Sequence, residues 1–413
     1  MAHRVGLLTA GGDAAGLNVC LKAIVNGAVD RGFEVVGIRK GWEGLLRIDP
    51  RSPSSQAEHA MVLTKPRVRD IDRTAGSFLH SSRVNPSSVS PHWLPAFAQV
   101  DRSSARMVDM TDHIKRVIEQ LHLEVVVLLG DSYSLEYAAR LDREGVPIIA
   151  IPKSVHNDVS GSDYCLGFST ALASGVRFVH EVRAMAGSRE EVAVVETFGR
   201  TNGLTTMLIS TLASADRLLI PEVPFDPERL AALLLDDKRL NPNNYAILGM
   251  SEAVSIDPAK ASKYNPELAR RAGARRPALA SAQGDGADGP EDAFMIAGER
   301  AVGLGAAGGG AVVTEILENL LGERVLFQPL SYLLRVGQPD GQDLLGAMNF
   351  AYRAVELLTG GKTGRLIAYR RGENYVDVPL EVVTQPGGTL DVAEYYDAAR
   401  YVAKPGVMWA ARV

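Results

Sequence analysis

The chain has 413 residues, and its 44 Lys and Arg against 49 Asp and Glu give a formal net charge of −5. A hydrophobic fraction of 46% is typical of a globular protein and excludes a disordered or low-complexity chain. The mild acidity, without a concentrated basic patch, argues against nucleic acid or a membrane surface as a partner.

The length predicts two or three domains at roughly 150 residues each. The only cysteines, Cys20 and Cys165, lie in apolar segments, so disulfide bonds are not expected to hold the fold together. The N-terminal segment lacks the apolar region of a signal peptide, and no run of about eighteen apolar residues occurs. We therefore expect a cytoplasmic protein that does not span a membrane.

The first part of the chain alternates between strand and helix patterns. Residues 4–10 predict a buried strand, apolar residues at helical spacing follow over 17–28, and residues 34–39 return to a strand pattern. The same alternation predicts further strands at 124–129, 147–151, 191–196, 217–220, 245–250 and 365–369. Strands separated by helices indicate an α/β fold with mostly parallel sheets and helices on both faces.

Two stretches interrupt this alternation. Residues 52–104 are rich in Ser, Arg and Pro, and residues 259–292 show no periodicity. We expect the second stretch to be a flexible surface insertion, with an anion site at its arginines as the alternative. Residues 344–359 predict an amphipathic helix that ends at Gly360 and Gly361.

The first strand ends in a glycine-bearing turn, Gly11-Gly12-Asp13, before a helix begins. Glycines at such a turn let backbone N–H groups approach a phosphate, and the helix N-terminus favours an anion. The spacing matches neither a dinucleotide-binding nor a Walker A motif. An anion site is predicted here, with a purely structural turn as the alternative.

A second turn, Gly130-Asp131-Ser132-Tyr133-Ser134, also follows a predicted buried strand and opens a helix. A carboxylate at the carboxyl end of a parallel strand is placed to meet Mg²⁺ bound to substrate phosphates. The alternative is that Asp131 only caps the helix. A third turn brings Lys153, Ser154, His156 and Asp158 into one loop, a composition suited to phosphoryl transfer.

Seven segments in this order resemble the signature segments of the phosphofructokinase family: TAGGDAAGLN, AGSFLHSSRVNP, LGDSYS, PKSVHNDVSGSDYCLGFSTA, VVETFGRTNG, LIPE and LLRVGQPDGQD. The resemblance implies two Rossmann-like lobes and a homodimer or homotetramer. It assigns residues 1–155, with about 340–413, to a lobe that binds the phosphoryl donor. Residues 156–340 form the acceptor lobe, which includes the insertion at about 259–292.

The resemblance implies a donor, ATP or pyrophosphate, bound with Mg²⁺ as the cofactor and Asp131 as its protein ligand. The other donor-binding residues are Gly11, Gly12, Trp42, Arg73, Gly130, Ser132 and Ser134. Trp42 falls where the family commonly has an aromatic residue near the nucleotide, and a core tryptophan is the equal alternative. Arg73 is included because Thr74 replaces a family arginine.

For catalysis, the resemblance places His156 where the family has its aspartate base, with Asp158 near the metal. A neutral imidazole near pH 7 can accept the hydroxyl proton. Arg200, which matches an acceptor-site arginine, and Lys153 would stabilise charge.

The acceptor-binding residues implied by the resemblance are Ser154, Glu191, Phe198, Gly199, Glu222, Tyr332 and Arg335. Glu191 and Leu326 stand where the family supplies arginines to the 6-phosphate of fructose 6-phosphate. A carboxylate repels that phosphate by several kcal/mol at an effective dielectric of about 20. We therefore expect an altered acceptor, a sugar, cyclitol or other polyol without that phosphate, or one with an amine.

Alternatives remain open at this point. Arg189 and Arg324 can replace the missing clamp, which would leave a conventional 6-phosphofructokinase that converts fructose 6-phosphate to fructose 1,6-bisphosphate. A non-catalytic metabolite-binding homologue would follow if His156 marks a lost base. Arg39 and Lys40, at the end of the second strand, stand where an NADP phosphate can bind, but the glycine spacing of a dinucleotide-dependent oxidoreductase is missing.

Overall fold

The computed structural model describes residues 3–98, 107–199, 202–264, 309–385 and 390–406. The chain divides into two compact units. Unit 1 comprises residues 1–171 and 335–388, and unit 2 comprises residues 172–334 and 389–412. Residues 156–171 thus belong to unit 1, because Lys153 and Leu166 form a parallel bridge that holds this segment beside the end of a unit 1 strand. Residues 389–412 belong to unit 2, where the backbone of Tyr401 binds Leu218.

Unit 1 is built on a seven-stranded sheet in the order β11-β10-β5-β4-β1-β2-β3. The parallel strands are β1 (Arg4–Ala10), β2 (Glu34–Ile38), β4 (Val125–Gly130), β5 (Ile148–Pro152) and β10 (Arg365–Arg370). Two antiparallel strands, β3 (Ala60–Leu63) and β11 (Asn374–Pro379), form its edges. The central strands are apolar and buried on both faces, as in other parallel sheets.

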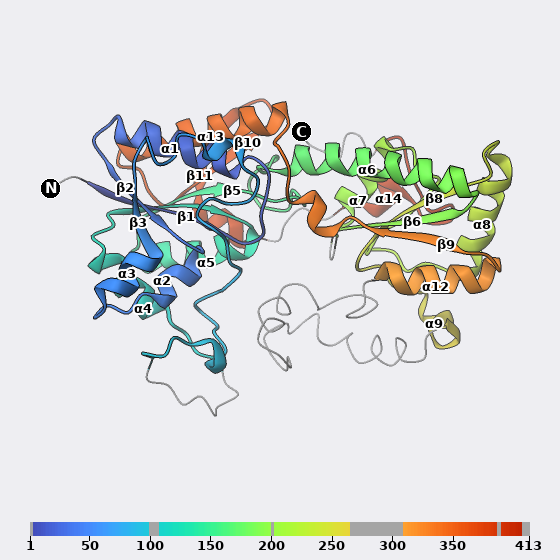
Figure 1. Ribbon diagram of the computed structural model, residues 1–413, viewed down its shortest axis with the longest axis horizontal. Helices are drawn as coiled ribbons and strands as arrows, with labels where there is room; N and C mark the ends of the chain where they lie inside the picture. The colour runs from blue at the N-terminus through green and yellow to red at the C-terminus, as the bar shows by residue number, and fades with distance from the viewer. Residues whose placement is uncertain (1–2, 99–106, 200–201, 265–308, 386–389, 407–413) are drawn as a thin grey trace. The chain divides into compact units, whose positions relative to one another are not determined.

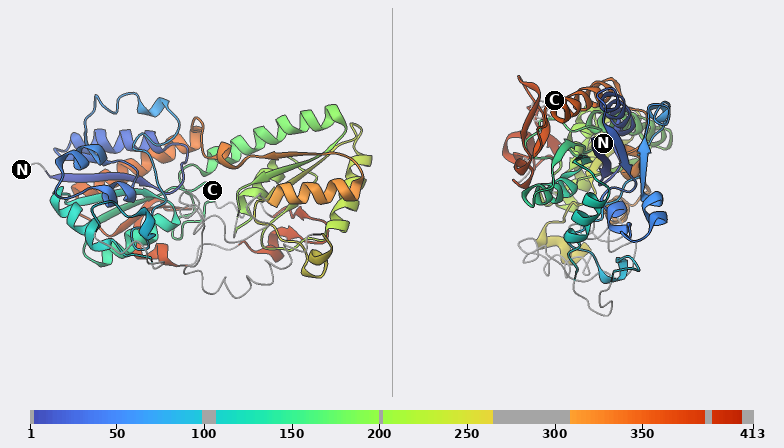
Figure 2. Two further views of the ribbon diagram at one scale, coloured as in Figure 1. Left: turned by 60° about the horizontal axis from the view of Figure 1, so that its bottom comes forward. Right: turned by 90° about the vertical axis from the view of Figure 1, so that its left-hand side faces the viewer.

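Helices cover both faces of this sheet. Figures 1 and 2 show α1 (Leu17–Val29) and α13 (Gly341–Thr359) side by side on one face, and Figure 1 shows α5 (Ser132–Arg143) on the other. The remaining helices of the unit are α2 (Trp42–Arg47), α3 (Pro53–His59), α4 (Thr111–Gln120) and the short η1 (Ile71–Arg73), η2 (Pro91–Trp93) and η5 (Leu380–Thr384). The apolar residues of α1 that recur at helical spacing are buried, so this face forms the core.

Unit 2 contains a four-stranded parallel sheet in the order β7-β8-β6-β9. Its strands are β6 (Val192–Thr197), β7 (Arg217–Leu219), β8 (Ala246–Ser251) and β9 (Val325–Pro329). In Figure 1, α6 (Phe168–Arg189) lies above this sheet and α12 (Gly309–Leu321) below it. The other elements are α7 (Leu204–Leu212), α8 (Pro227–Leu240), α9 (Pro258–Tyr264), η4 (Ser331–Leu334), α14 (Val392–Tyr395) and the β12 (Tyr396–Asp397)–β13 (Val402–Ala403) pair.

The predicted α/β class with mostly parallel sheets is confirmed. Regular structure also occurs where the sequence pattern was irregular. Within 52–104, Ser52 caps α3 by accepting a hydrogen bond from the Ser55 N–H at 3.3 Å, and Pro53 fixes its first turn. The first residues of the predicted insertion, up to Tyr264, form α9, and residues 265–292 lie outside the described residues. Among the described helices, none combines the length and the apolar character needed to cross a membrane.

Candidate active site

Three turns meet at the carboxyl edge of the unit 1 sheet. Strand β1 pairs Ala10 with Gly130 of β4, and β4 pairs Gly130 with Pro152 of β5. Gly11, Asp131 and Lys153 are the next residues of the three strands, so the register places them side by side. The strand order reverses between β1 and β4, and in open α/β sheets ligands bind at such a switch point.

Direct contacts join the three turns into one cradle, which we define as Gly11, Gly12, Asp131 and Lys153. The Gly12 N–H donates to Asp131 Oδ2 at 3.1 Å, and the Lys153 ammonium donates to the Gly12 carbonyl at 2.5 Å. A Cβ on Gly11 would lie 1.9 Å from Asp131 Oδ2, and Gly11 has a φ of 88°. Both space and backbone conformation therefore require glycine there.

Asp131 has two tasks. Its Oδ1 caps α5 by accepting from the N–H of Ser134 at 3.2 Å and from its hydroxyl at 2.8 Å, while Oδ2 faces Gly12. Burial opposes ionisation of this carboxyl, but the Lys153 ammonium, the Ser134 hydrogen bonds and Arg83 together lower its pKa below the usual value. Asp131 is therefore an anion within the cradle. Gly130 and Ser132 flank it in the chain.

Three cations surround Gly12. Lys153 is 1% exposed, and burial lowers the pKa of its ammonium to about 8, although Asp131 and Asp13 oppose the shift. A Cβ on Gly12 would lie 2.5 Å from Nη1 of Arg335 and 2.9 Å from Nη2 of Arg83. Arg335, predicted to bind the acceptor, thus reaches the cradle. Arg83 was not among the predicted residues, although it lies in one of the segments that resemble the family.

The loop after β5 positions His156 and Asp158. The Ser154 hydroxyl donates to Asp158 Oδ1 at 2.6 Å and accepts from the His156 N–H at 3.0 Å. Burial lowers the pKa of His156 to about 4, helped by Arg335 and Arg83 and opposed by Asp158. The imidazole is therefore neutral near pH 7 and is able to accept a proton.

Asp343 supports this loop from α13. Its buried carboxylate accepts hydrogen bonds from the N–H groups of Gly167 at 2.7 Å and Thr170 at 2.8 Å, from the Thr170 hydroxyl and from the Tyr164 hydroxyl. We call this set the Asp343 network. It fixes residues 164–170, which bond to the loop after β5 through a hydrogen bond from the Ser154 N–H to the Leu166 carbonyl at 3.1 Å. Asp343 lies in the first turn of α13, where acidic residues are common, so the sequence gave no signal for this role.

Two predicted donor residues make their contacts outside the cradle. Trp42 is 1% exposed, its indole N–H donates to the Ser134 carbonyl at 3.3 Å, and its ring meets Tyr137 edge-on. It is a core residue with no open face for a nucleobase, which is the alternative the sequence left open. The Arg73 side chain is 78% exposed, and its guanidinium lies 3.5 Å from Asp70.

The predicted acceptor residues of unit 2 divide between the two ends of its sheet. Phe198 and Gly199 follow the carboxyl end of β6, where the Tyr332 ring packs edge-on against Phe198. Glu222 Oε1 accepts from the Gly203 N–H at 2.8 Å, and burial raises the pKa of Glu222.

Glu191 precedes β6 instead. Six strand residues separate it from Phe198, or roughly 20 Å at about 3.3 Å per residue. Its carboxylate lies 4.0 Å from Nη1 of Arg189. Within unit 2, Glu191 and Glu222 therefore do not form one site. Arg200 lies outside the described residues.

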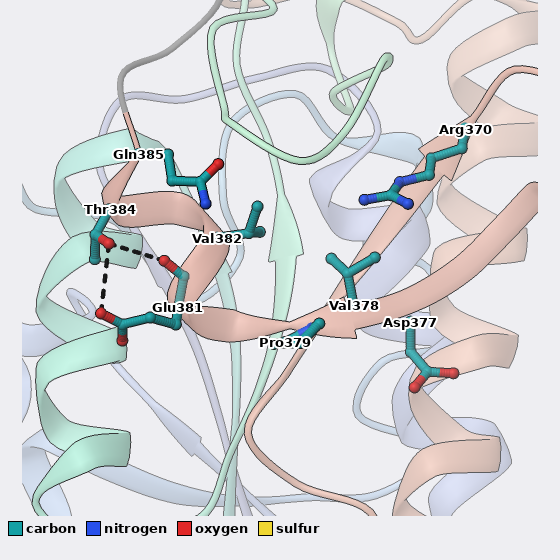
Figure 3. Close-up of a pocket in the computed structure, with 8 residues that line it drawn as sticks. All are labelled: Arg370, Asp377, Val378, Pro379, Glu381, Val382, Thr384 and Gln385. Carbon is teal, nitrogen blue, oxygen red and sulfur yellow. Dashed lines mark hydrogen bonds between the residues drawn. The ribbon is translucent and has the colours of Figure 1, made fainter.

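A cavity of about 390 Å³ lies elsewhere in unit 1, and it contains none of the predicted site residues. Figure 3 shows the side chains that line it: Arg370, Asp377, Val378, Pro379, Glu381, Val382, Thr384 and Gln385. Within it, the Thr384 hydroxyl donates to the Glu381 carbonyl at 2.9 Å. The Gln385 carbonyl accepts from the Ser160 hydroxyl at 2.8 Å, so this segment contacts the chain just after the loop that contains His156 and Asp158.

Comparison with known proteins agrees with this geometry. A family model described as phosphofructokinase matches residues 4–358. A pyrophosphate–fructose 6-phosphate 1-phosphotransferase of Dictyoglomus thermophilum is 28% identical over 403 residues, which cover 96% of this chain and 97% of the relative. An ATP-dependent 6-phosphofructokinase of Chloroflexus aggregans is 29% identical over 380 residues, which cover 92% and 90%.

A solved structure has the same fold. The pyrophosphate-dependent phosphofructokinase of Nitrosospira multiformis aligns with a TM-score of 0.73 at 15% identity, covering 100% of this chain and 91% of that chain. The family model spans most of the 413 residues, including every turn of the cradle. The chain therefore belongs to the phosphofructokinase family, and the resemblance from which its kinase class was predicted is confirmed.

Proposed function

We propose that this protein is a Mg²⁺-dependent phosphotransferase that moves a phosphoryl group from ATP or pyrophosphate to a hydroxyl of a sugar or sugar phosphate. One observation carries the proposal: the ionised Asp131 and the cations Lys153, Arg83 and Arg335 converge around Gly12 at the switch point of the unit 1 sheet. Phosphoryl transfer depends mainly on positioning and on stabilising charge around the transferred group. This arrangement supplies both.

The donor would bind in unit 1, with its phosphates against the cradle. Mg²⁺ is commonly held by one or two carboxylates together with substrate phosphates. Asp131 supplies a carboxylate, and Asp13 Oδ1 is a buried oxygen that has no hydrogen-bond donor among the described residues. No group of three His, Cys, Asp or Glu able to hold a metal occurs in the described part of the chain, so the remaining ligands would come from the donor.

His156 would act as the general base. A base with a pKa of about 4 has the proton affinity of a carboxylate, so burial makes this imidazole comparable to the aspartate that the family has in its place. Ser154 and Asp158 hold the loop in position through the 2.6 Å hydrogen bond between them. Lys153, Arg335 and Arg83, with the predicted Arg200, would stabilise the charge that develops during transfer.

Fructose 6-phosphate is the first acceptor to test, because both relatives described above are named for it. Glu191, at the amino end of β6, occupies the position that the resemblance gives to a phosphate-binding arginine, so its negative charge still argues against a 6-phosphate and is the reason for the second candidate below. Like other members, the protein would work as a homo-oligomer. The free, buried Cys20 and Cys165 suit a reducing compartment such as the cytoplasm.

An acceptor without the 6-phosphate is the second candidate. The described segments that leave the carboxyl ends of the unit 2 strands are 198–199, 202–206, 220–225, 252–257 and 330–334, and they contain no Lys or Arg. They contain the acids Glu222, Glu252 and Asp257 instead. Carboxylates bind hydroxyls or an amine better than a dianionic phosphate. This edge therefore also suits a polyol or an amino sugar.

The test is a coupled assay of the full chain with Mg²⁺, pairing ATP or pyrophosphate with fructose 6-phosphate, the unphosphorylated sugar and an amino sugar. We expect saturable turnover with one donor, lost on Asp131→Asn. The matched control is Asp112→Asn, an acidic residue in the first turn of α4 outside the cradle. Absence of turnover with every pair, joined by a gain of activity in His156→Asp, would instead identify a non-catalytic homologue.

A further inference from the structure

The cavity of unit 1 that Figure 3 shows lies along the edge strand β11 and contains none of the residues assigned to the donor or the acceptor. We call it the β11 cavity. Its volume of about 390 Å³ is within the range of pockets that bind small molecules. Val378, Pro379 and Val382 give it an apolar lining, while Arg370 and Gln385 supply polar groups. Apolar side chains with a few polar groups among them are typical of a ligand site.

The Arg370 guanidinium is the group in the β11 cavity that points most directly to a ligand. Its side chain is half-buried at the end of β10, and within the described ranges it has no hydrogen-bond acceptor and no carboxylate at ion-pair distance. Figure 3 shows this guanidinium and the Gln385 side-chain amide directed toward each other across Val382. Both groups can donate hydrogen bonds, so an oxyanion between them would be bound from two sides.

The two carboxylates that line the cavity already have cationic partners. Asp377 binds two arginines, of which Arg365 donates through Nε at 2.8 Å, and Glu381 accepts from Nη1 of Arg143 at 2.8 Å. Each acid is thus paired, and the positive charge of Arg370 remains. The β11 cavity therefore favours an anion, and a planar guanidinium can bind either a carboxylate or a phosphate group through two parallel hydrogen bonds.

Direct contacts join the β11 cavity to the segment that follows the His156–Asp158 loop. The Ser160 hydroxyl donates to the Gln385 carbonyl at 2.8 Å. A Cβ on Gly161, which has a φ of 91°, would lie 2.5 Å from Cγ1 of Val382. The backbone of this segment therefore packs directly against a side chain that lines the cavity.

Further hydrogen bonds continue this path into the loop itself. Asp163 Oδ2 accepts from the N–H of Arg371, the residue after Arg370, at 3.0 Å. The Asp163 carbonyl in turn accepts from the side-chain amide of Asn157 at 2.8 Å. Asn157 lies in the middle of the His156–Asp158 loop. The cavity and the loop are thus connected by an unbroken series of contacts.

We propose that the β11 cavity is a regulatory site for a small organic anion, a carboxylate or a phosphate monoester, that binds to Arg370 and orders the His156–Asp158 loop. The anionic group would lie between Arg370 and Gln385, and a short aliphatic chain would contact the valine and proline side chains. Binding and ordering depend only on the contacts described above, whereas the effect on turnover rests on the proposed function.

The binding test is a saturation-transfer NMR titration of the full chain with butyrate, butyl phosphate and butyramide, the neutral analogue of butyrate. We expect wild type to bind at least one of the two anions about tenfold more tightly than the amide. In Arg370→Gln the affinity for that anion should fall at least about tenfold, because its charged hydrogen bonds are lost. Arg371→Gln is the matched control: it removes the same charge one residue away, outside the cavity, and should change the affinity less than about twofold.

Amide hydrogen exchange tests the effect on the loop. Saturation of wild type with the bound anion should slow the exchange of residues 156–163 at least about threefold, and no such change should occur in Arg370→Gln. Under the proposed function, the same anion should also change the turnover of wild type at least about twofold, without an effect on Arg370→Gln.

Binding of butyrate alone identifies a carboxylate as the ligand, and binding of butyl phosphate alone identifies a phosphate ester. Equal affinities of wild type and Arg370→Gln, equal binding of butyramide, or no binding of either anion overturns the site. Binding that depends on Arg370 without slower exchange at residues 156–163 overturns the regulatory role. Absence of turnover with every donor overturns the proposed function instead, and the binding and exchange results still decide the fate of the cavity proposal.

Discussion

Lys153 is the residue on which the electrostatics of the cradle depend most directly. Its ammonium is buried, donates to the Gly12 carbonyl and faces the ionised Asp131. A cation of this kind attracts donor phosphates only while it is protonated. Burial lowers its pKa to about 8, so the charge is present below that pH and is lost above it.

We therefore expect kcat/KM for the donor to fall as the pH rises through about 8, because this ratio reports groups of the free enzyme. The measurement is a pH series of initial rates at fixed ionic strength. In Lys153→Arg the guanidinium stays charged, so the fall near pH 8 should disappear. A fall that persists unchanged in Lys153→Arg would assign it to the donor or to another group.

His156 determines how the rate depends on pH on the acidic side of the profile. Because its pKa is lowered from the ordinary 6.5 to about 4, the base stays neutral and the rate should hold from pH 7 to about pH 5. His156→Asp should keep measurable activity, and His156→Gln should lose about 10²- to 10⁴-fold in kcat. Rates that decline with a midpoint near 6.5, or an unchanged rate in His156→Gln, would exclude this residue as the base.

The same shift links pH to stability. The folded pKa of His156 lies below its unfolded value, so the unfolded chain binds more protons between about pH 6.5 and 4. The contribution of His156 to the free energy of unfolding is thus largest above 6.5 and falls as the pH drops.

A substitution at Trp42 distinguishes a role in core packing from a role in donor binding. Its indole is buried against Tyr137 and bonds to the Ser134 carbonyl, which lies in the helix that Asp131 caps. Trp42→Phe should lower the free energy of unfolding by about 1–3 kcal/mol and leave the donor KM within about twofold. Urea denaturation and initial rates measure the two effects. A large rise in KM with no loss of stability would restore Trp42 to the donor site.

At the scale of elements, the Asp343 network joins α13 to the start of α6 and to the segment that follows the His156–Asp158 loop. One buried carboxylate there satisfies two backbone N–H groups and two hydroxyls. Removal of the Asp343 carboxylate alone is costly, because its buried donors are then left without acceptors. The loop that contains His156 and Asp158 is therefore positioned by an element far from it in the sequence.

We expect Asp343→Ala to lower the free energy of unfolding by about 3 kcal/mol or more, and Tyr164→Phe by about 1 kcal/mol, since the latter removes a single hydrogen bond. Both are measured by chemical denaturation. Glu356→Ala is the matched control, because this exposed carboxylate of α13 pairs with Arg353 at the surface and its loss should cost less than about 0.5 kcal/mol. Equal effects of Asp343→Ala and Glu356→Ala would contradict the network.

Over the whole molecule, the sequence predicted the elements whose pattern is local. Apolar strands followed by glycine or acidic turns located β1, β4 and β5, and the turns after them meet as expected because strand ends share one edge. The pattern did not predict that Arg83 and Arg335 both reach Gly12, since long-range approach leaves no periodic signal. The predicted strand at 191–196 already placed Glu191 and Phe198 at its opposite ends, although the resemblance assigned both residues to the acceptor.

The division of the chain into two units likewise depends on contacts between segments far apart in the sequence. Each unit has its own sheet and core, and segments far apart in sequence, such as α13 and β10, complete unit 1. Under the proposed function, the residues at the ends of the unit 1 strands would bind the donor, and those in unit 2 would bind the acceptor. The central claim is that the three turns of unit 1 act together on one phosphate donor.

The most direct test of that claim is a double-mutant cycle on donor binding, measured by titration calorimetry with the Mg²⁺ complex of whichever donor the protein uses. Asp131→Asn and Lys153→Met are examined singly and together. Because the two side chains serve one bound phosphate group, we predict a coupling energy of at least about 1 kcal/mol, with the double variant binding little worse than the poorer single variant. Strictly additive losses, or donor binding unaffected by either substitution, would contradict the account.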